Sequence, residues 1–161
     1  MGVKVSGLID SETMLLNIDS TLKRRARKVL VREAEKVQKL AIKMAPVDHG
    51  GLEEAIKITG NDATTARDEL GRFARVEVEV YVDMEAPGKD PNRGDVKVGD
   101  YAYEIHEHLE PVGEMKRGPK SNQKNSTNGG VEVGGGFMTR AALVIDDRIE
   151  EELKQILSGI V

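Results

Sequence analysis

The sequence predicts an α+β domain with a long N-terminal helix, a small antiparallel sheet and a C-terminal helix, joined by long flexible loops. Apolar residues recur at helical spacing over residues 11–44 and again over 137–157, while residues 74–82 alternate valine with polar side chains. The chain has 161 residues, which suits one domain with a modest core. We therefore expect a single domain over residues 1–161.

The first predicted helix follows a short extended lead-in at residues 3–8. Its apolar residues keep the spacing i, i+3, i+4 and i+7 from Leu15 to Met44, without an internal Gly or Pro. A single helix of this length is longer than one small domain covers. We expect that it either breaks near Asp19 and Ser20 or packs in part on another subunit.

The helix is predicted to end at an abrupt corner within the stretch KMAPVDHGGLEEAI. The residues of this structural corner are Pro46, Asp48, Gly50, Gly51 and Leu52. The residue before a proline avoids the helical region, so the helix ends here. The aspartate can accept bonds from backbone amides two residues on, and the glycines permit positive φ, which returns the leucine to the helix. A catalytic Asp48–His49 pair is the alternative, but adjacent side chains rarely present that geometry.

Beyond the corner, residues 55–59 and 74–82 are predicted strands, the second with its valines on one buried face. Residues 100–109 are a predicted short helix. Residues 84–99 and 110–136 are rich in glycine and polar residues, so we expect them to form the flexible loops.

Candidate chemistry is sparse in this sequence. His106 and His108 could ligate a metal, but on a helix residues two apart point away from each other. A metal-dependent hydrolase using His49, His106 and Glu104 is therefore the least favoured interpretation. The stretch VGGGF at residues 133–137 could cradle a phosphate, yet no Lys-Ser/Thr follows it, and we interpret it as a hinge. There is no cysteine. We expect no catalytic residue, no metal and no cofactor, and hence no enzyme.

The stretch KRRARK places a basic cluster on the first helix, formed by Lys23, Arg24, Arg25, Arg27 and Lys28. Such clusters neutralise phosphates, so contact with DNA is one interpretation. The net charge of −4 and the spread of these residues around the helix favour a solvated face or contact with acidic residues, such as 150–152, of a neighbouring subunit.

The order of these motifs resembles that of the gene-product-ten-like tail components of tailed phages, which are neck or tail-completion proteins. The family's Ala-Pro-Val-Asp-Thr-Gly-x-Leu corner is matched by Ala45, Pro46, Val47, Asp48, Gly50 and Leu52. Its second and third motifs are matched by Tyr101, Ala102 and Ile105, and by Phe137, Met138 and Ala141. The resemblance covers residues 3–157, with His49 in place of the usual threonine.

The resemblance implies a structural virion protein that forms a homo-oligomeric ring at the phage head–tail junction. Its partners would be further copies of itself, the head–tail connector, and the tail terminator or tail tube protein, with DNA passing through the lumen without sequence specificity. It would reside in the virion, and in the host cytoplasm during assembly, with no membrane partner. The alternative is a DNA-binding regulatory or processing protein that uses the basic helix 23–28. Residues that we expect at interfaces are Lys23, Arg24, Arg25, Arg27, Lys28, Lys116, Arg117, Lys120 and Phe137.

Overall fold

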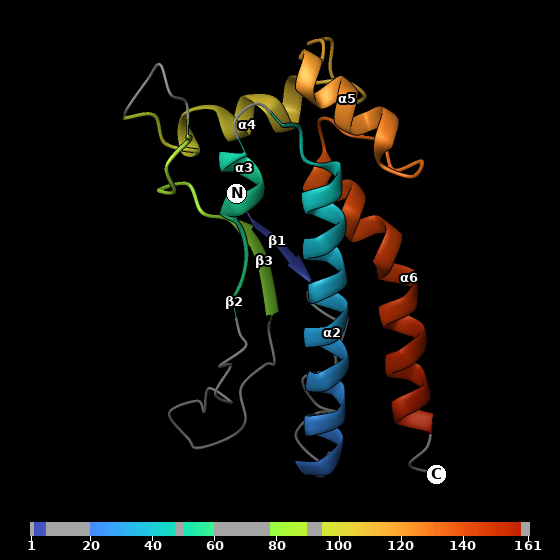
Figure 1. The fold of residues 1–161 in the computed structure, drawn as a ribbon. Helices are drawn as coiled ribbons and strands as arrows, with labels where there is room; N and C mark the ends of the chain where they lie inside the picture. The colour runs from blue at the N-terminus through green and yellow to red at the C-terminus, as the bar shows by residue number, and fades with distance from the viewer. Residues whose placement is uncertain (1, 6–19, 48–49, 60–77, 90–94, 159–161) are drawn as a thin grey trace.

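The computed structural model describes residues 2–5, 20–47, 50–59, 78–89 and 95–158. In chain order the elements are β1 (Gly2–Val5), α2 (Ser20–Met44), α3 (Gly51–Ala55), β2 (Ile56–Thr59), β3 (Val78–Val82), α4 (Gly99–His108), α5 (Pro119–Thr127) and α6 (Phe137–Ser158). The predicted α+β class is confirmed. Figure 1 shows α2 and α6 running side by side in opposite directions, with the sheet on one side of α2 and α4 and α5 across its C-terminal end.

The sheet has the strand order β1-β3-β2, so β3 lies in the centre and pairs with both neighbours in antiparallel fashion. In the register, Val80 lies opposite Val3 on one side and Ile58 on the other. Val78, Val80 and Val82 are buried, as the alternation predicts, while the residues between them are half-buried. Residues 74–77 of the predicted strand lie outside the described residues.

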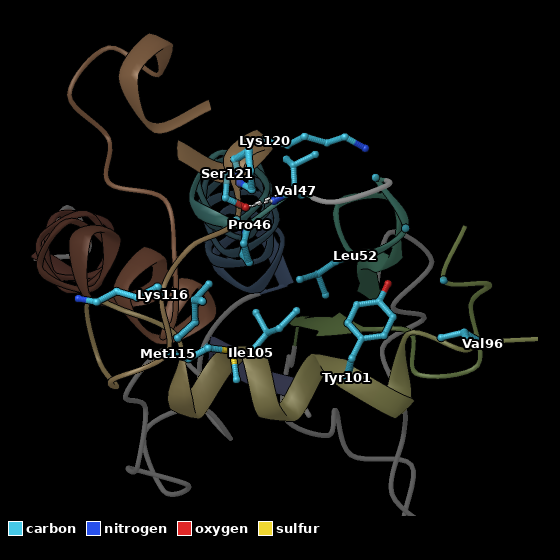
Figure 2. A pocket seen from close by; sticks show the side chains of 16 residues that line it. Pro46, Val47, Leu52, Val96, Tyr101, Ile105, Met115, Lys116, Lys120 and Ser121 are labelled. Carbon is cyan, nitrogen blue, oxygen red and sulfur yellow. Dashed lines mark hydrogen bonds between the residues drawn. The ribbon is translucent and has the colours of Figure 1, made fainter. Parts of the chain in front are cut away.

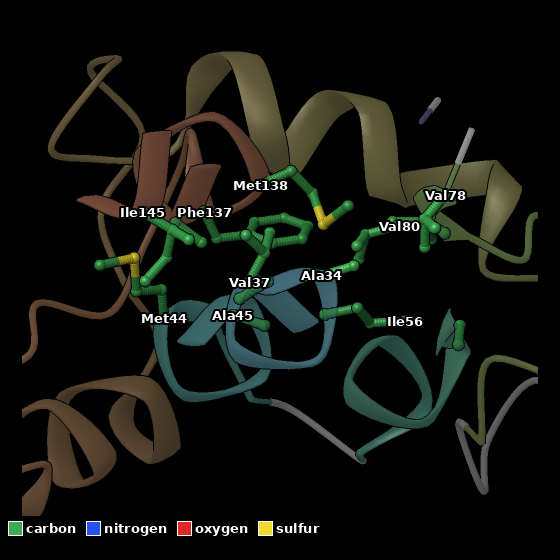
Figure 3. Close-up of a cluster of buried hydrophobic side chains, with 14 of the residues drawn as sticks. Ala34, Val37, Met44, Ala45, Ile56, Val78, Val80, Phe137, Met138 and Ile145 are labelled. Atoms are coloured by element: carbon green, nitrogen blue, oxygen red, sulfur yellow. The ribbon is translucent and has the colours of Figure 1, made fainter. Parts of the chain in front are cut away.

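The core lies where α2 meets both α6 and the sheet (Figure 3). Ala34 and Val37 contribute from α2, Phe137 and Met138 from the first turn of α6, and Val80 from the central strand. All five side chains are fully buried. Burying a large aliphatic or aromatic side chain contributes about 1.5–3 kcal/mol, so this aliphatic cluster is the main source of stability.

The corner after α2 agrees with the prediction at Pro46, Gly50 and Leu52, whereas Gly51 does not have the positive φ that was expected of both glycines. Pro46 and Leu52 are buried, and Gly50 has φ 85°, a left-handed conformation that glycine adopts without strain. A Cβ on Gly51 would lie 2.7 Å from the carbonyl oxygen of Gly88, so a glycine there permits close approach of the loop before α4. Asp48 and the neighbouring His49 lie outside the described residues.

Two helices differ from the sequence prediction. The five residues Gly51–Ala55, part of which was predicted as strand, form the short helix α3. The predicted loop 110–136 contains α5, so the expectation of a continuous loop is wrong for residues 119–127. The described part of α2 begins at Ser20, and residues 11–19 lie outside the described residues, so the two alternatives for this helix, a break near Asp19 and Ser20 or packing on another subunit, stay predictions.

The positive φ of Gly50 gives the first testable prediction. Gly50→Val should lower the free energy of unfolding by about 1–3 kcal/mol, because a β-branched side chain is strained in the left-handed region. No atom lies within 4 Å of a Cβ placed at this position, so a clash would not contribute. Gly50→Asn is the matched control and should lose less, because asparagine tolerates this conformation. Denaturant unfolding measures both, and equal midpoints for the two variants would contradict this account.

Candidate interaction site

The C-terminal end of α2 is held by a lysine from α5. The last four carbonyls of an α-helix have no partner inside the helix. Lys124 donates to two of the free carbonyls at this end, with Nζ 2.7 Å from the oxygens of Ile42 and of Ala45. The same Nζ lies 2.6 Å from Oε1 of Glu53 on α3. A cation at this position also interacts favourably with the helix dipole, so one side chain joins α2, α3 and α5.

The two carbonyls that lie between these, those of Lys43 and Met44, are bonded by the segment that follows α5. Asn128 Nδ2 donates to the Lys43 oxygen at 2.8 Å, and the Gly134 amide donates to the Met44 oxygen at 2.8 Å. A segment of polar side chains and glycines far along the chain thus completes the cap of α2.

Ser121 connects α5 to the corner itself. Its hydroxyl donates to the Val47 carbonyl and accepts from the Val47 amide, both at 2.9 Å. Both backbone groups of one corner residue are therefore satisfied by a single buried side chain. The sequence analysis did not find Ser121, Lys124 or Asn128, because α5 has no apolar periodicity. Its sequence signal was Pro119, which suits the first turn of a helix.

The glycine run before α6 is a close crossing of backbones rather than a hinge. The Gly135 amide donates to the Glu110 oxygen and the Gly136 amide to the His106 oxygen, at 3.0 and 2.7 Å. A Cβ on Gly135 would lie 2.2 Å from the Leu109 carbonyl oxygen. The amides of the three glycines, Gly134, Gly135 and Gly136, are donated to the carbonyls of Met44, Glu110 and His106, so these three amides do not point at an open phosphate site.

His106 is a buried packing residue at this crossing. Its ring meets Phe137 edge to face, with centroids 5.2 Å apart, and its Nδ1 lies 2.9 Å from Oε1 of Glu107. His108 is exposed and lies on a different side of α4. Within the described part of the chain, no three His, Cys, Asp or Glu side chains are grouped so that they could hold a metal.

A pocket of about 590 Å³ opens beside the corner, between α3, α4 and the start of α5 (Figure 2). Its apolar lining comes from Pro46, Val47, Leu52, Val96, Tyr101, Ile105, Leu109 and Met115. Lys116 and Lys120 line it from the segment leading into α5, and both are exposed. The Ser121 hydroxyl in its wall is already bonded to Val47, so the pocket combines an apolar interior with a basic rim.

Several large apolar side chains are exposed on the described surface. They are Tyr103, Val112, Met115, Leu143 and Val144. Leu143 and Val144 are adjacent on α6 and are 65% and 53% exposed. Single exposed apolar residues are ordinary, but an adjacent pair on one helix is a small apolar surface without a described partner.

The predicted interface residues outside the basic cluster fall into three groups. Phe137 is completely buried in the core, which corrects its assignment to a surface. Arg117 is mostly buried, and its guanidinium donates to the Val133 oxygen at 2.7 Å and to Glu110 Oε1 at 3.2 Å, so its contacts lie within the chain. Lys116 and Lys120 remain at the surface beside the pocket.

The basic cluster is only partly described. Arg25 and Lys28 are exposed on α2 and Arg27 is half-buried, whereas nothing is described of the side chains of Lys23 and Arg24. These five residues are not near the pocket, which lies at the other end of α2 (Figure 1).

Two of the acidic residues expected to meet the basic cluster of a neighbour already have partners in the same chain. Glu152 pairs with Arg32 of α2, and Glu150 pairs with Lys154 one turn away on α6. Arg32 also contacts Glu33, which is fully buried. Burial raises the pKa of Glu33, but hydrogen bonds from Lys36 and Arg32 outweigh it and hold the pKa below its ordinary value.

Comparisons of the chain with family models, with curated proteins and with solved structures found no match. Among the described residues, no helix has the length and apolar character that crossing a membrane requires. The interpretation of this protein therefore depends on its own residues and geometry.

The lysine cap of α2 gives a second prediction. Lys124→Met should lower the free energy of unfolding by about 1.5–3 kcal/mol, because it removes charged hydrogen bonds and leaves partly buried oxygens without a donor. Gln123→Met, at an exposed position of the same helix, is the control and should change the free energy of unfolding by less than about 0.5 kcal/mol. Chemical denaturation followed by circular dichroism distinguishes them, and a Lys124→Met variant as stable as the control would refute the cap.

The glycine crossing gives a third prediction. Gly135→Ala should destabilise the protein by about 1–3 kcal/mol, because its Cβ would meet the backbone of α4 and either the loop or the helix must shift. The control is Gly118→Ala, where nothing lies within 4 Å of the added Cβ. There the lower entropy of the unfolded chain roughly offsets weaker capping, so the change should be within about 0.5 kcal/mol. Thermal unfolding compares the two, and equal losses would show that the crossing is not tight.

Proposed function

We propose that this protein is a structural virion protein that forms a homo-oligomeric ring at the phage head–tail junction and joins the connector to the tail. The observation that carries the proposal is spatial. The three motifs on which the family resemblance depends meet at one end of the fold: the corner after α2, the first turns of α4 and the start of α6. Motifs far apart in the sequence thus belong to one structural unit.

The surface around this unit supports a role in assembly. A ring subunit presents two different surfaces, one to each neighbour, because a head-to-tail contact joins unlike patches. The described surface offers an open apolar pocket beside the corner and, separately, the exposed pair Leu143 and Val144 on α6. Both features suit protein–protein contacts, and neither requires a reacting group.

A DNA-binding regulatory or processing protein is the alternative, and the exposure of Arg25 and Lys28 favours it. Binding through such residues would neutralise phosphates and would weaken steeply between roughly 50 and 200 mM salt. A ring protein at the junction would also meet DNA in its lumen, so weak binding without sequence preference fits either function. The two differ in whether the protein assembles and enters the particle.

The proposal is tested by deleting the gene in its phage and by adding the purified protein back. We expect the deletion to yield filled heads and separate tails, and the purified protein to restore infectious particles in a mixture of the two. Negative-stain electron microscopy of the concentrated protein should show closed rings of one size. Normal virions without the protein would refute the proposal, and a monomer that binds DNA tightly and in a salt-dependent way would favour the alternative.

A further inference from the structure

We propose that the pocket beside the corner receives Leu143 and Val144 of a neighbouring copy of this chain. This inference rests on the proposed function, because it assigns the two halves of the contact that would build the ring. The acceptor half is the pocket between α3, α4 and the start of α5. The donor half is the exposed face of α6 that carries the two aliphatic residues.

The pocket is large enough to hold a pair of aliphatic side chains, and its lining is mainly apolar. Its volume of about 590 Å³ lies within the roughly 300–1,000 Å³ of pockets that enclose small ligands. Leu52 and Ile105 form apolar walls, and Tyr101 and Met115 lie at its sides (Figure 2). Met115 is 41% exposed, so an incoming side chain can cover it.

The donor carries the opposite charge to the rim of the acceptor. Asp146 and Glu150 follow Leu143 at positions i+3 and i+7 of α6, so all three share one exposed stripe. Glu150 already pairs with Lys154, so Asp146 is the carboxylate that the contact would use. The rim of the pocket carries Lys116, whose side chain is 85% exposed. Its Nζ lies 3.4 Å from Oε2 of Glu110 in the same chain. In the proposed contact, an apolar pair beside the Asp146 carboxylate would therefore face an apolar pocket beside the Lys116 ammonium group. Such complementarity orients a contact and selects the partner.

The two halves lie on different sides of the molecule. In Figure 1, α3 and α4 extend to one side of α2 while α6 covers the other. Each copy can therefore accept one neighbour and donate to another at the same time. A contact between unlike patches generates a ring when the rotation closes.

Cysteine cross-linking tests this contact directly, because the chain contains no cysteine. Leu143→Cys and Met115→Cys, purified separately and mixed under mild oxidation, should form a disulfide-linked dimer. The double variant should form a covalent ladder up to the size of the ring. The control pair replaces Met115→Cys with Tyr103→Cys, a position on α4 that lies outside the pocket and is more exposed (58% against 41%), and it should form no specific product. Equal cross-linking of both pairs would overturn the inference.

Charge exchange provides an independent test that does not depend on cysteine reactivity. Lys116→Glu should weaken assembly by about tenfold or more, because a carboxylate would face Asp146 of the neighbour. Asp146→Lys should weaken it similarly, and the combined variant should recover most of the loss. Tyr103→Lys is the control that should assemble normally. Mass photometry measures assembly, and circular dichroism checks that every variant is folded.

The outcomes separate this inference from the proposed function. If the wild-type protein forms rings but the charge variants and Leu143→Lys assemble like wild type, the inference fails and the ring stands. If the wild-type protein forms no ring under any condition and its deletion leaves virions intact, the proposed function fails. If Leu143→Cys cross-links to the connector or a tail protein and not to Met115→Cys, another protein occupies the pocket and the inference is overturned.

Discussion

The C-terminal end of α2 is bonded to residues that follow it by as many as 90 positions in the sequence, from Met44 to Gly134, and the arrangement of the other elements depends on this contact. Lys124 and Asn128 satisfy the carbonyls that the helix leaves open, and Gly134 adds a main-chain bond. Without these donors, the corner would carry buried carbonyls that lack partners, each costing about 1–3 kcal/mol. The cap therefore stabilises the helix and also decides where α5 and the start of α6 must lie.

The pocket is a consequence of the same contact. Ser121 holds α5 against Val47, and the close approach of Gly51 to Gly88 sets the loop before α4 against α3. The space between these elements remains open because each is fixed at its edge, by the Ser121 hydroxyl or by the Gly51–Gly88 contact, and not by side chains that fill the middle. A polar helix anchored at its ends thus leaves an apolar hollow beside it, which is the feature that our proposals use.

The sequence predicts the elements that bury apolar surface. The periodicity of α2 and α6 and the alternation of Val78, Val80 and Val82 follow from one-sided burial, and the structure agrees with both. The corner was also predictable, because Pro46 and Gly50 restrict the backbone locally. By contrast, α5 is stabilised by Lys124 and Ser121 reaching carbonyls in a distant helix, and no local pattern reveals such partners. The same reason explains why Phe137, which we expected at an interface, lies in the core. Its neighbours are set by the backbone crossing of the glycine run with the end of α4, and not by the pattern of its own segment.

The glycine run joins the ends of three helices through main-chain atoms. Gly134 is bonded to the end of α2, Gly135 and Gly136 are bonded to the end of α4, and α6 begins at the next residue. Side chains can rotate about their bonds and absorb a displacement, but a backbone held at van der Waals contact on both sides cannot. A force applied along α6 would therefore reach α2 and α4 with little loss, and the three helix ends would move as one rigid joint. Such a joint would make the fold stiff at the end that carries the pocket.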